Sequence, residues 1–135
     1  MPSWSLEYSF DVDVDKAIVY EKIHGIWKLD TAIKYHQDFQ KEVQPLIAKP
    51  WAKLVNLSNW RTSYPQVVSR IGEHLQWCRK HNMVLSINVL NNPSTFRQLN
   101  EMFVVGHTKQ MSQVFRTQAE AMKYLEEHWF AKLNK

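Results

Sequence analysis

The sequence predicts an α/β domain built on a mixed, mostly parallel sheet of about five strands, with helices on both faces. Three observations support this fold class: strict alternation near the N-terminus, two later short apolar runs, and amphipathic stretches of helical period between them. Strands separated by helices are joined by right-handed crossovers, which makes them parallel. The expected order is β-β-α-β-α-β-α-β-α, in a single domain covering residues 1–135.

The first two elements are expected to form a β-hairpin. Residues 5–14, SLEYSFDVDV, alternate between apolar side chains such as Leu6 and Tyr8 and polar ones such as Glu7 and Asp11. This pattern is typical of a strand with one face in water, and its acidic face disfavours edge-to-edge pairing. A short turn at Asp15 leads into the apolar stretch AIVYEKIHG. The first strand is therefore predicted to be the antiparallel one.

The first helix is predicted over residues 29–47. Its apolar residues recur at steps of three and four, as on one face of a helix. Asp30 is the expected N-cap, because its carboxylate can accept from a free backbone N–H. Pro50 lies beyond the predicted end and prevents the helix from continuing.

The remaining elements alternate strand and helix. AKLVNLS and MVLSINVL are mostly apolar and suit strands covered on both faces. Residues 65–81 are predicted to be helical, NNPSTFRQLNEMF to contain a short helix, and SQVFR to be the last strand. Thr117 and Glu120 match a capping box that opens the final helix. That helix is expected to bury Ala121, Met122, Leu125 and Trp129, with Leu133 as a further candidate.

Charge and composition narrow the function classes. The net charge is +4, divided between −4 for residues 1–15 and +8 for the remainder. The basic residues are spread evenly rather than clustered, so nucleic-acid binding is not expected. No apolar run approaches the roughly 18 residues of a membrane span, and the N-terminus lacks the pattern of a signal peptide. With one cysteine, no intrachain disulfide is possible, and a cytoplasmic location is expected.

No catalytic or cofactor motif is recognisable. Gly25, Gly72 and Gly106 are too far apart for a phosphate-binding loop, and no G-x-S-x-G nucleophile motif is present. We therefore expect no cofactor and no catalytic residue. An enzyme that uses His36 or Asp30 is a third-ranked hypothesis, because a histidine on an apolar helix face is more often a core residue.

His74, Cys78 and His81 share one face of the second predicted helix, since they follow the spacing i, i+4 and i+7. This spacing is compatible with a metal site, and the alternative is a core position for Cys78 and a helix-end position for His81. The core interpretation is favoured because no second cluster of ligands is evident, so no metal is predicted.

Trp51 and Trp60 bracket the third predicted strand and are harder to bury completely than the other tryptophans. Packing at the core or its rim is favoured. Contact with a ligand or with a second copy in a homodimer stays open as the alternative.

Three segments, AKLVNLSNW, VFRTQAEAMKYLEEHW and HGIWKLD, resemble corresponding stretches of the SpoIIAA-like, or STAS-like, proteins. These are small bacterial domains related to anti-sigma-factor antagonists. The resemblance extends over nearly the whole chain but consists of hydrophobic and capping patterns. It implies a bacterial, regulatory domain that binds a protein partner.

In classical anti-sigma antagonists, a loop after the third strand carries a phosphorylatable serine in an Asp-Ser-Ser-Gly-like motif. The corresponding stretch here is NLSNWRTSYPQ, with Asn56 where an aspartate is common and no glycine after Ser63. From the residues themselves, we predict a polar turn followed by a helix with Pro65 in its first turn and a cap at Ser63 or Tyr64. The resemblance thus implies the position of a switch without its phosphorylation motif.

The sequence therefore predicts a non-enzymatic binding or regulatory module that engages a protein partner. The alternative is a domain that binds a small apolar molecule or a lipid in a pocket near the Ser58–Gln66 loop, walled by Trp51 and Trp60. In both cases the predicted binding loop consists of Ser58, Asn59, Trp60, Arg61, Thr62, Ser63 and Tyr64.

Overall fold

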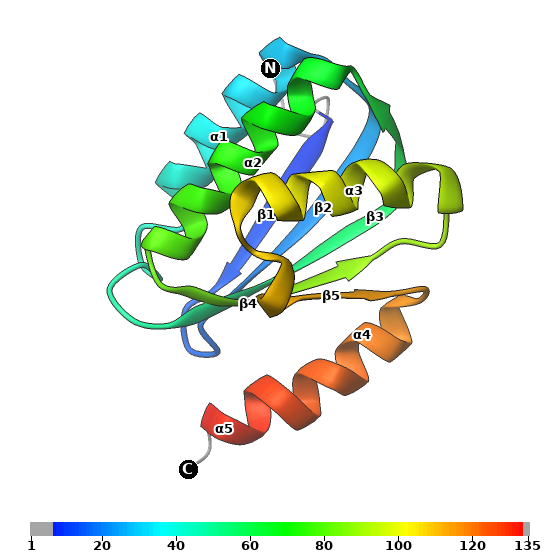
Figure 1. Cartoon of the computed structure of the whole chain (residues 1–135). Coiled ribbons are helices and arrows are strands. Elements are labelled where there is room, and N and C mark those ends of the chain that lie inside the picture. Colours follow the sequence, from blue (N-terminus) through cyan, green and yellow to red (C-terminus); the bar gives the residue numbers. More distant parts are fainter. Residues whose placement is uncertain (1–6, 134–135) are drawn as a thin grey trace.

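The computed structural model describes residues 7–133, which form a five-stranded sheet with helices on both faces (Figure 1). The predicted fold class and element order are confirmed. The strands are β1 Tyr8–Asp13, β2 Ile18–Trp27, β3 Trp51–Ser63, β4 Met83–Val89 and β5 Ser112–Phe115. The main helices are α1 Leu29–Glu42, α2 Pro65–Lys80, α3 Pro93–Gly106 and α4 Gln118–Leu125. Short helical segments η2 Lys109–Met111, η3 Glu126–Phe130 and α5 Ala131–Leu133 complete the described chain.

The sheet has the order β1-β2-β3-β4-β5. β1 pairs antiparallel with β2, and all later pairs are parallel, so the predicted hairpin is confirmed. The expected first strand began at Ser5, and its residues Ser5 and Leu6 lie outside the described residues. Because β2 to β5 run in the same direction, their carboxyl ends meet at one edge of the sheet. We call this the carboxyl edge.

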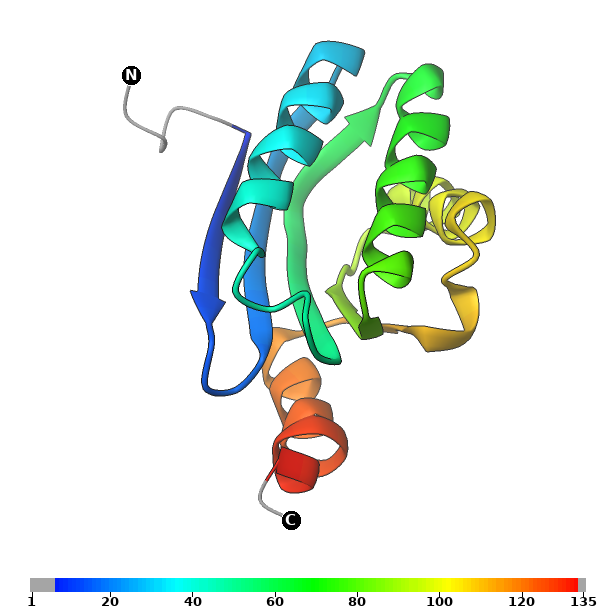
Figure 2. The same ribbon diagram turned by 90° about the vertical axis from the view of Figure 1, so that its left-hand side faces the viewer.

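The two faces of the sheet bury separate cores. Figures 1 and 2 show α1, α2 and α3 together on one face and the chain from α4 to α5 on the other. The smaller core, under α4, joins sheet residues to the last helical turns and consists of Ile18, Ala52, Leu54, Ile87, Val89, Ala121, Leu125 and Trp129. Thr117 Oγ1 accepts from the Glu120 backbone N–H at 3.2 Å, which confirms Thr117 as the predicted cap, and Glu120 Oε1 accepts from the same hydroxyl at 3.0 Å. Leu133 is exposed, so its predicted burial is wrong.

The predicted start of the first helix at Leu29 is confirmed, but its predicted end at Ile47 and its predicted N-cap, Asp30, are wrong. Helix α1 stops at Glu42, because Pro45 lacks an N–H and its ring would clash with the preceding helical turn. Val43 and Leu46 remain buried in turns that follow, which explains why the apolar period runs on. The N-cap is Lys28, without a side-chain bond, and Asp30 lies in the first turn, where a carboxylate favours the helix dipole.

The predicted turn from Ser58 to Ser63 is wrong: this segment continues β3 as a strand. Strand β2 extends past its pairing with β1 and supplies partners for the second half of β3, including Gly25 opposite Trp60 and Trp27 opposite Ser63. Two register shifts occur in this stretch, and Gly25 adopts a left-handed φ of 75°. The long parallel neighbour satisfies backbone groups that we had assigned to a turn.

Both tryptophans that bracket the apolar part of β3 are buried, which confirms the favoured prediction of core packing, and the alternative of an exposed pair is wrong. Trp51 is 0% exposed and Trp60 is 4% exposed. Each indole still finds a partner: Trp51 donates to the His81 carbonyl at 2.6 Å, and Trp60 donates to Ser63 Oγ at 3.1 Å. Within residues 7–133, no helix combines the length and apolar character needed to cross a membrane.

Candidate functional site

The strand character of the predicted binding loop divides its residues into two sets. Ser58, Asn59, Arg61 and Thr62 are exposed, whereas Trp60 and Ser63 are buried. The buried side chains recur every third residue, at Leu57, Trp60 and Ser63, because two register shifts interrupt the regular alternation of the strand here. The last loop residue, Tyr64, is exposed at the start of α2.

Ser63, near the end of the predicted binding loop, has a partner for its hydroxyl, its backbone N–H and its carbonyl. Its hydroxyl accepts from the Trp60 indole. Its backbone N–H donates to Gln98 Oε1 at 3.0 Å, and its carbonyl accepts from Gln98 Nε2 at 2.7 Å. Gln98 also accepts from the Thr62 hydroxyl at 3.2 Å. The end of β3 is therefore tied to α3, and Ser63 is a structural residue in this conformation.

The N-cap of α2 is one of the two residues predicted for it, Tyr64, and not Ser63. Tyr64 occupies the N-cap and makes no side-chain capping bond, while Pro65 takes the first-turn position that was predicted. The backbone N–H of Tyr64 donates to the Trp27 carbonyl at 3.0 Å, which binds the helix start to the end of β2.

Several large apolar side chains are exposed around the carboxyl edge. Phe96, in the first turns of α3, is 46% exposed, and Thr62 has Ile26 as its neighbour on β2. Basic residues lie close to these apolar residues along the chain. We define the carboxyl-edge surface by its exposed apolar residues Ile26, Leu29, Tyr64 and Phe96 and its exposed basic residues Lys28, Arg61 and Arg97.

A groove of about 820 Å³ adjoins this surface between the start of α3 and the edge strand β5. Phe96 and Asn92 form part of one wall, and Arg116 follows the end of β5. Lys109 also lines the groove, which has no acidic residue among its lining side chains. The groove is therefore apolar in part and positively charged, and it lies where open α/β sheets commonly bind ligands.

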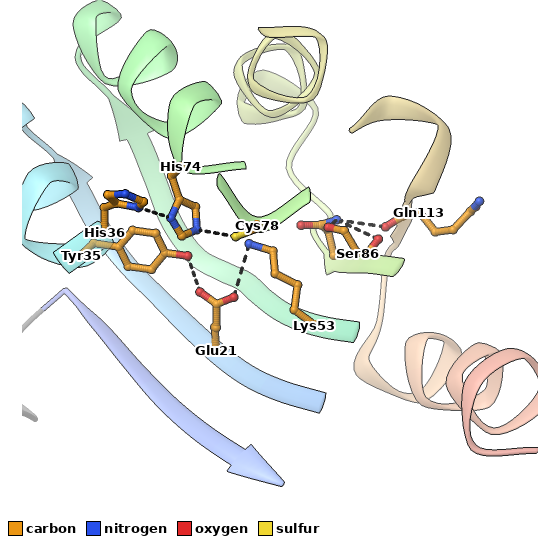
Figure 3. Close-up of polar contacts among 9 residues, drawn as sticks. Glu21, Tyr35, His36, Lys53, His74, Cys78, Ser86 and Gln113 are labelled. Atoms are coloured by element: carbon orange, nitrogen blue, oxygen red, sulfur yellow. Dashed lines mark hydrogen bonds and ion pairs between the residues drawn. The ribbon is translucent and has the colours of Figure 1, made fainter. Parts of the chain in front are cut away.

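A second group of polar side chains is buried between the sheet and α1. Glu21 of β2 accepts a hydrogen bond from the Tyr35 hydroxyl, and its other oxygen lies 3.4 Å from Lys53 Nζ on β3 (Figure 3). Within residues 7–133, that second oxygen has no hydrogen-bond partner beyond this ion pair. Burial, together with the neighbouring carboxylate, raises the pKa of Tyr35 well above its usual value.

Two histidines extend this buried group. His36 Nδ1 lies 2.8 Å from His74 Nδ1, and His74 Nε2 lies 3.6 Å from Cys78 Sγ (Figure 3). Burial, reinforced by Lys53 and His36, holds the pKa of His74 well below its usual range. Burial raises the pKa of the Cys78 thiol to about 12, so this cysteine stays protonated and unreactive at neutral pH.

The structure brings together only part of the predicted metal pattern. His74 and Cys78 are in contact in the core, but the His81 ring stacks on Trp77 at 4.2 Å between ring centres. Within residues 7–133, no three His, Cys, Asp or Glu side chains are grouped so that they could hold a metal ion. His36, expected in the core, is half-buried and hydrogen-bonded to His74.

A cavity of about 60 Å³ lies between the sheet and helices α2 and α3. Most of its lining is aliphatic or aromatic, and Lys53, Ser63, His74 and Asn88 also line it. Lys53 was not among the predicted site residues. The signal that could have found it is a charged residue within the apolar run AKLVNLS, matched by Glu21 in the preceding strand.

Neither a protein-family model nor a curated protein sequence matches the chain. Several solved structures are similar to it in fold. An uncharacterised protein of the DUF3478 family with a SpoIIAA-like fold, from Shewanella loihica PV-4, superposes with a TM-score of 0.61 at 11% identity. The match covers 87% of this chain and 91% of that one.

Two further solved structures are similar. An anti-sigma factor antagonist from Mycobacterium paratuberculosis gives a TM-score of 0.59 at 16% identity, over 88% of this chain and 94% of that chain. The protein TM1081 gives 0.56 at 12% identity, over 87% and 86%. At these identities the likeness concerns the fold, and it confirms the predicted resemblance at that level. The chain has a SpoIIAA-like, or STAS-like, fold.

Proposed function

We propose that this protein is a non-enzymatic regulatory module that binds an acidic segment of a protein partner at its carboxyl edge. The groove beside α3 supports this proposal most directly, because it pairs the exposed Phe96 with Lys109 and Arg116 and has no acidic lining residue. A partner segment with carboxylates and an apolar side chain complements such a surface.

The position of the groove also supports binding of a protein rather than catalysis. It lies along β5, an edge strand whose outer side can pair with an extended segment of another chain. One of the similar solved structures is an anti-sigma factor antagonist, which favours a regulatory role for the same fold here. The proposal includes a bacterial origin and a cytoplasmic location, as expected from the sequence.

The predicted binding residues contribute unequally to this proposal. Arg61, Thr62 and Tyr64 are exposed, and the Thr62 hydroxyl donates to Gln98 of α3, so they are retained as partner contacts, with Ser58 and Asn59 earlier in the strand. Trp60 and Ser63 support the surface from below. Trp60→Ala would therefore test packing rather than recognition, and it is a poor probe of binding.

Affinity selection from a random peptide library displayed on phage tests the proposal. We expect enriched peptides to be acidic and to carry an aromatic or aliphatic residue. Their binding should fall about tenfold or more in Phe96→Ala and in Arg116→Glu. The matched controls are Val104→Ala, an exposed apolar residue later in α3, and Lys123→Glu on α4. Peptides of no common charge, or equal losses in the control variants, would remove the carboxyl edge from the model.

A further inference from the structure

Lys53 is the least expected residue of the protein interior. Its side chain is 4% exposed, it extends from the central strand β3, and it lines the 60 Å³ cavity. A buried ammonium is stable only when it is paired and hydrogen-bonded. The contacts of this group therefore indicate what the cavity accepts.

The protein meets only part of the bonding capacity of the ammonium. An ammonium carries three N–H donors, and the structure gives it one ion pair, with Glu21 Oε2 at 3.4 Å. Its next notable neighbour is the Phe39 ring, whose centre lies 5.5 Å away. Neighbouring polar groups are committed elsewhere: the Tyr35 hydroxyl donates to Glu21, and both His74 nitrogens face His36 and Cys78.

The cavity opposite the ammonium is lined mainly by hydrocarbon. Ile23, Leu57, Trp60, Leu75, Leu99 and Met102 contribute aliphatic or aromatic surface from β2, β3, α2 and α3. The N–H donors of the Lys53 ammonium lie on one side of the cavity, and most of the remaining lining is apolar. Such a cavity favours a ligand that is apolar apart from one hydrogen-bond acceptor.

We propose that this cavity is a binding site for a small neutral carbonyl compound, a ketone or an ester of about four non-hydrogen atoms, whose oxygen accepts a hydrogen bond from Lys53 Nζ. This site is separate from the carboxyl-edge surface. It names a ligand class for the alternative function predicted from the sequence, the binding of a small apolar molecule.

Charge and size argue against other ligand classes. Glu21 already balances the charge of Lys53, so a bound anion would leave an uncompensated negative charge in the interior. A cation would be repelled by the ammonium. A long acyl chain exceeds a cavity of about 60 Å³, so a lipid is excluded from the proposed site.

A matched pair of ligands tests the proposal on the unmodified protein. Acetone and isobutene have nearly the same shape, but only the ketone carries an acceptor. In NMR titrations that follow methyl signals, we expect acetone to shift Leu57, Leu99 and Met102 saturably. It should bind about tenfold or more tightly than the hydrocarbon, because a hydrogen bond to a charged donor is lost in the hydrocarbon complex.

A double variant identifies the donor. Glu21→Gln with Lys53→Met removes both charges together and keeps similar side-chain volumes. We expect it to bind the two ligands equally, whereas the exposed control Lys22→Met should keep the preference for the ketone. Equal affinity of both ligands for the unmodified protein would overturn the proposal, as would an absence of saturable shifts in the cavity methyls. The comparison on the unmodified protein decides the question even if the double variant does not fold.

Discussion

The two faces of the sheet are built on different principles. Under α1, α2 and α3, the core includes an ion pair, two histidines and a cavity. Under α4, the buried cluster consists of apolar residues. The indole N–H of Trp129 is a polar group within it, and it donates to the Lys16 carbonyl at 2.8 Å. The apolar face can only stabilise the fold, whereas the polar face also makes stability depend on charge and pH. The proposed small-molecule site accordingly belongs to the polar face.

The largest expected effect comes from breaking the buried ion pair on one side. Lys53→Met should lower the free energy of unfolding by about 3–5 kcal/mol, since it leaves the Glu21 carboxylate buried without its partner. Chemical denaturation measures this loss. Adding Glu21→Gln should restore most of the stability. If the double variant were as unstable as the single one, the loss would be due to packing and not to charge.

Truncation of the apolar face should cost nearly as much but through a cavity. Leu125→Ala removes a fully buried side chain from under α4, and we expect a loss of about 3 kcal/mol in the free energy of unfolding. The loss should be the same at pH 8 and pH 5.5, because no titratable side chain belongs to this cluster. A loss that grew on acidification would mean that the two faces are coupled.

The polar face should lose stability in mild acid. The folded state holds the pKa of His74 well below 6.5, so below that pH the unfolded chain binds a proton that the folded chain does not. Stability is therefore complete above about pH 6.5 and falls as pH decreases, by up to about 1.4 kcal/mol per pH unit. The half-buried His36 and the ammonium of Lys53 face the same ring.

Denaturation midpoints between pH 8 and pH 5.5 check this dependence. We expect His74→Phe to flatten it, because the new ring packs against Tyr35 and Phe39 and does not titrate. The exposed His107→Phe is the control and should leave the slope unchanged. An undiminished slope in His74→Phe would assign the effect to other groups.

The smallest expected effect lies at the start of α4. Thr117→Ala removes the hydroxyl that accepts from the Glu120 backbone N–H, and it should lower the free energy of unfolding by about 1 kcal/mol. Thr117→Ser keeps the acceptor and should be close to neutral. Thermal or chemical denaturation of the two variants measures the cap, and equal losses would show that the methyl group matters rather than the hydroxyl.

The proposed sites differ in how far the sequence revealed them. Arg61 and Tyr64 were predicted as binding residues and are exposed at the carboxyl edge, because parallel strands place their ends together. Phe96, Lys109 and Arg116 were missed. They lie on α3, on η2 and just after β5, and no local pattern reports that α3 and β5 approach each other closely enough to form a groove.

Misplaced element ends have a related cause. The apolar period of the first helix continues past Glu42 because Val43 and Leu46 are still buried, although Pro45 ends the helix. Polar residues after the apolar part of β3 look like a turn, yet the strand continues because β2 extends beside it. Periodicity shows which side chains are buried, and it does not show which backbone groups have found partners.

The sequence by itself determined the order of elements, the antiparallel hairpin and the helix cap at Thr117, because each depends on residues that are close together along the chain. Only the tertiary structure decided that β3 extends to Ser63 and that Glu21 lies beside Lys53 with a cavity next to the ammonium. Residues 21 and 53 sit on neighbouring strands joined by a helix. Their pairing depends on the register between β2 and β3, and the cavity depends on the space that the helices leave unfilled. No short stretch of sequence encodes either of these.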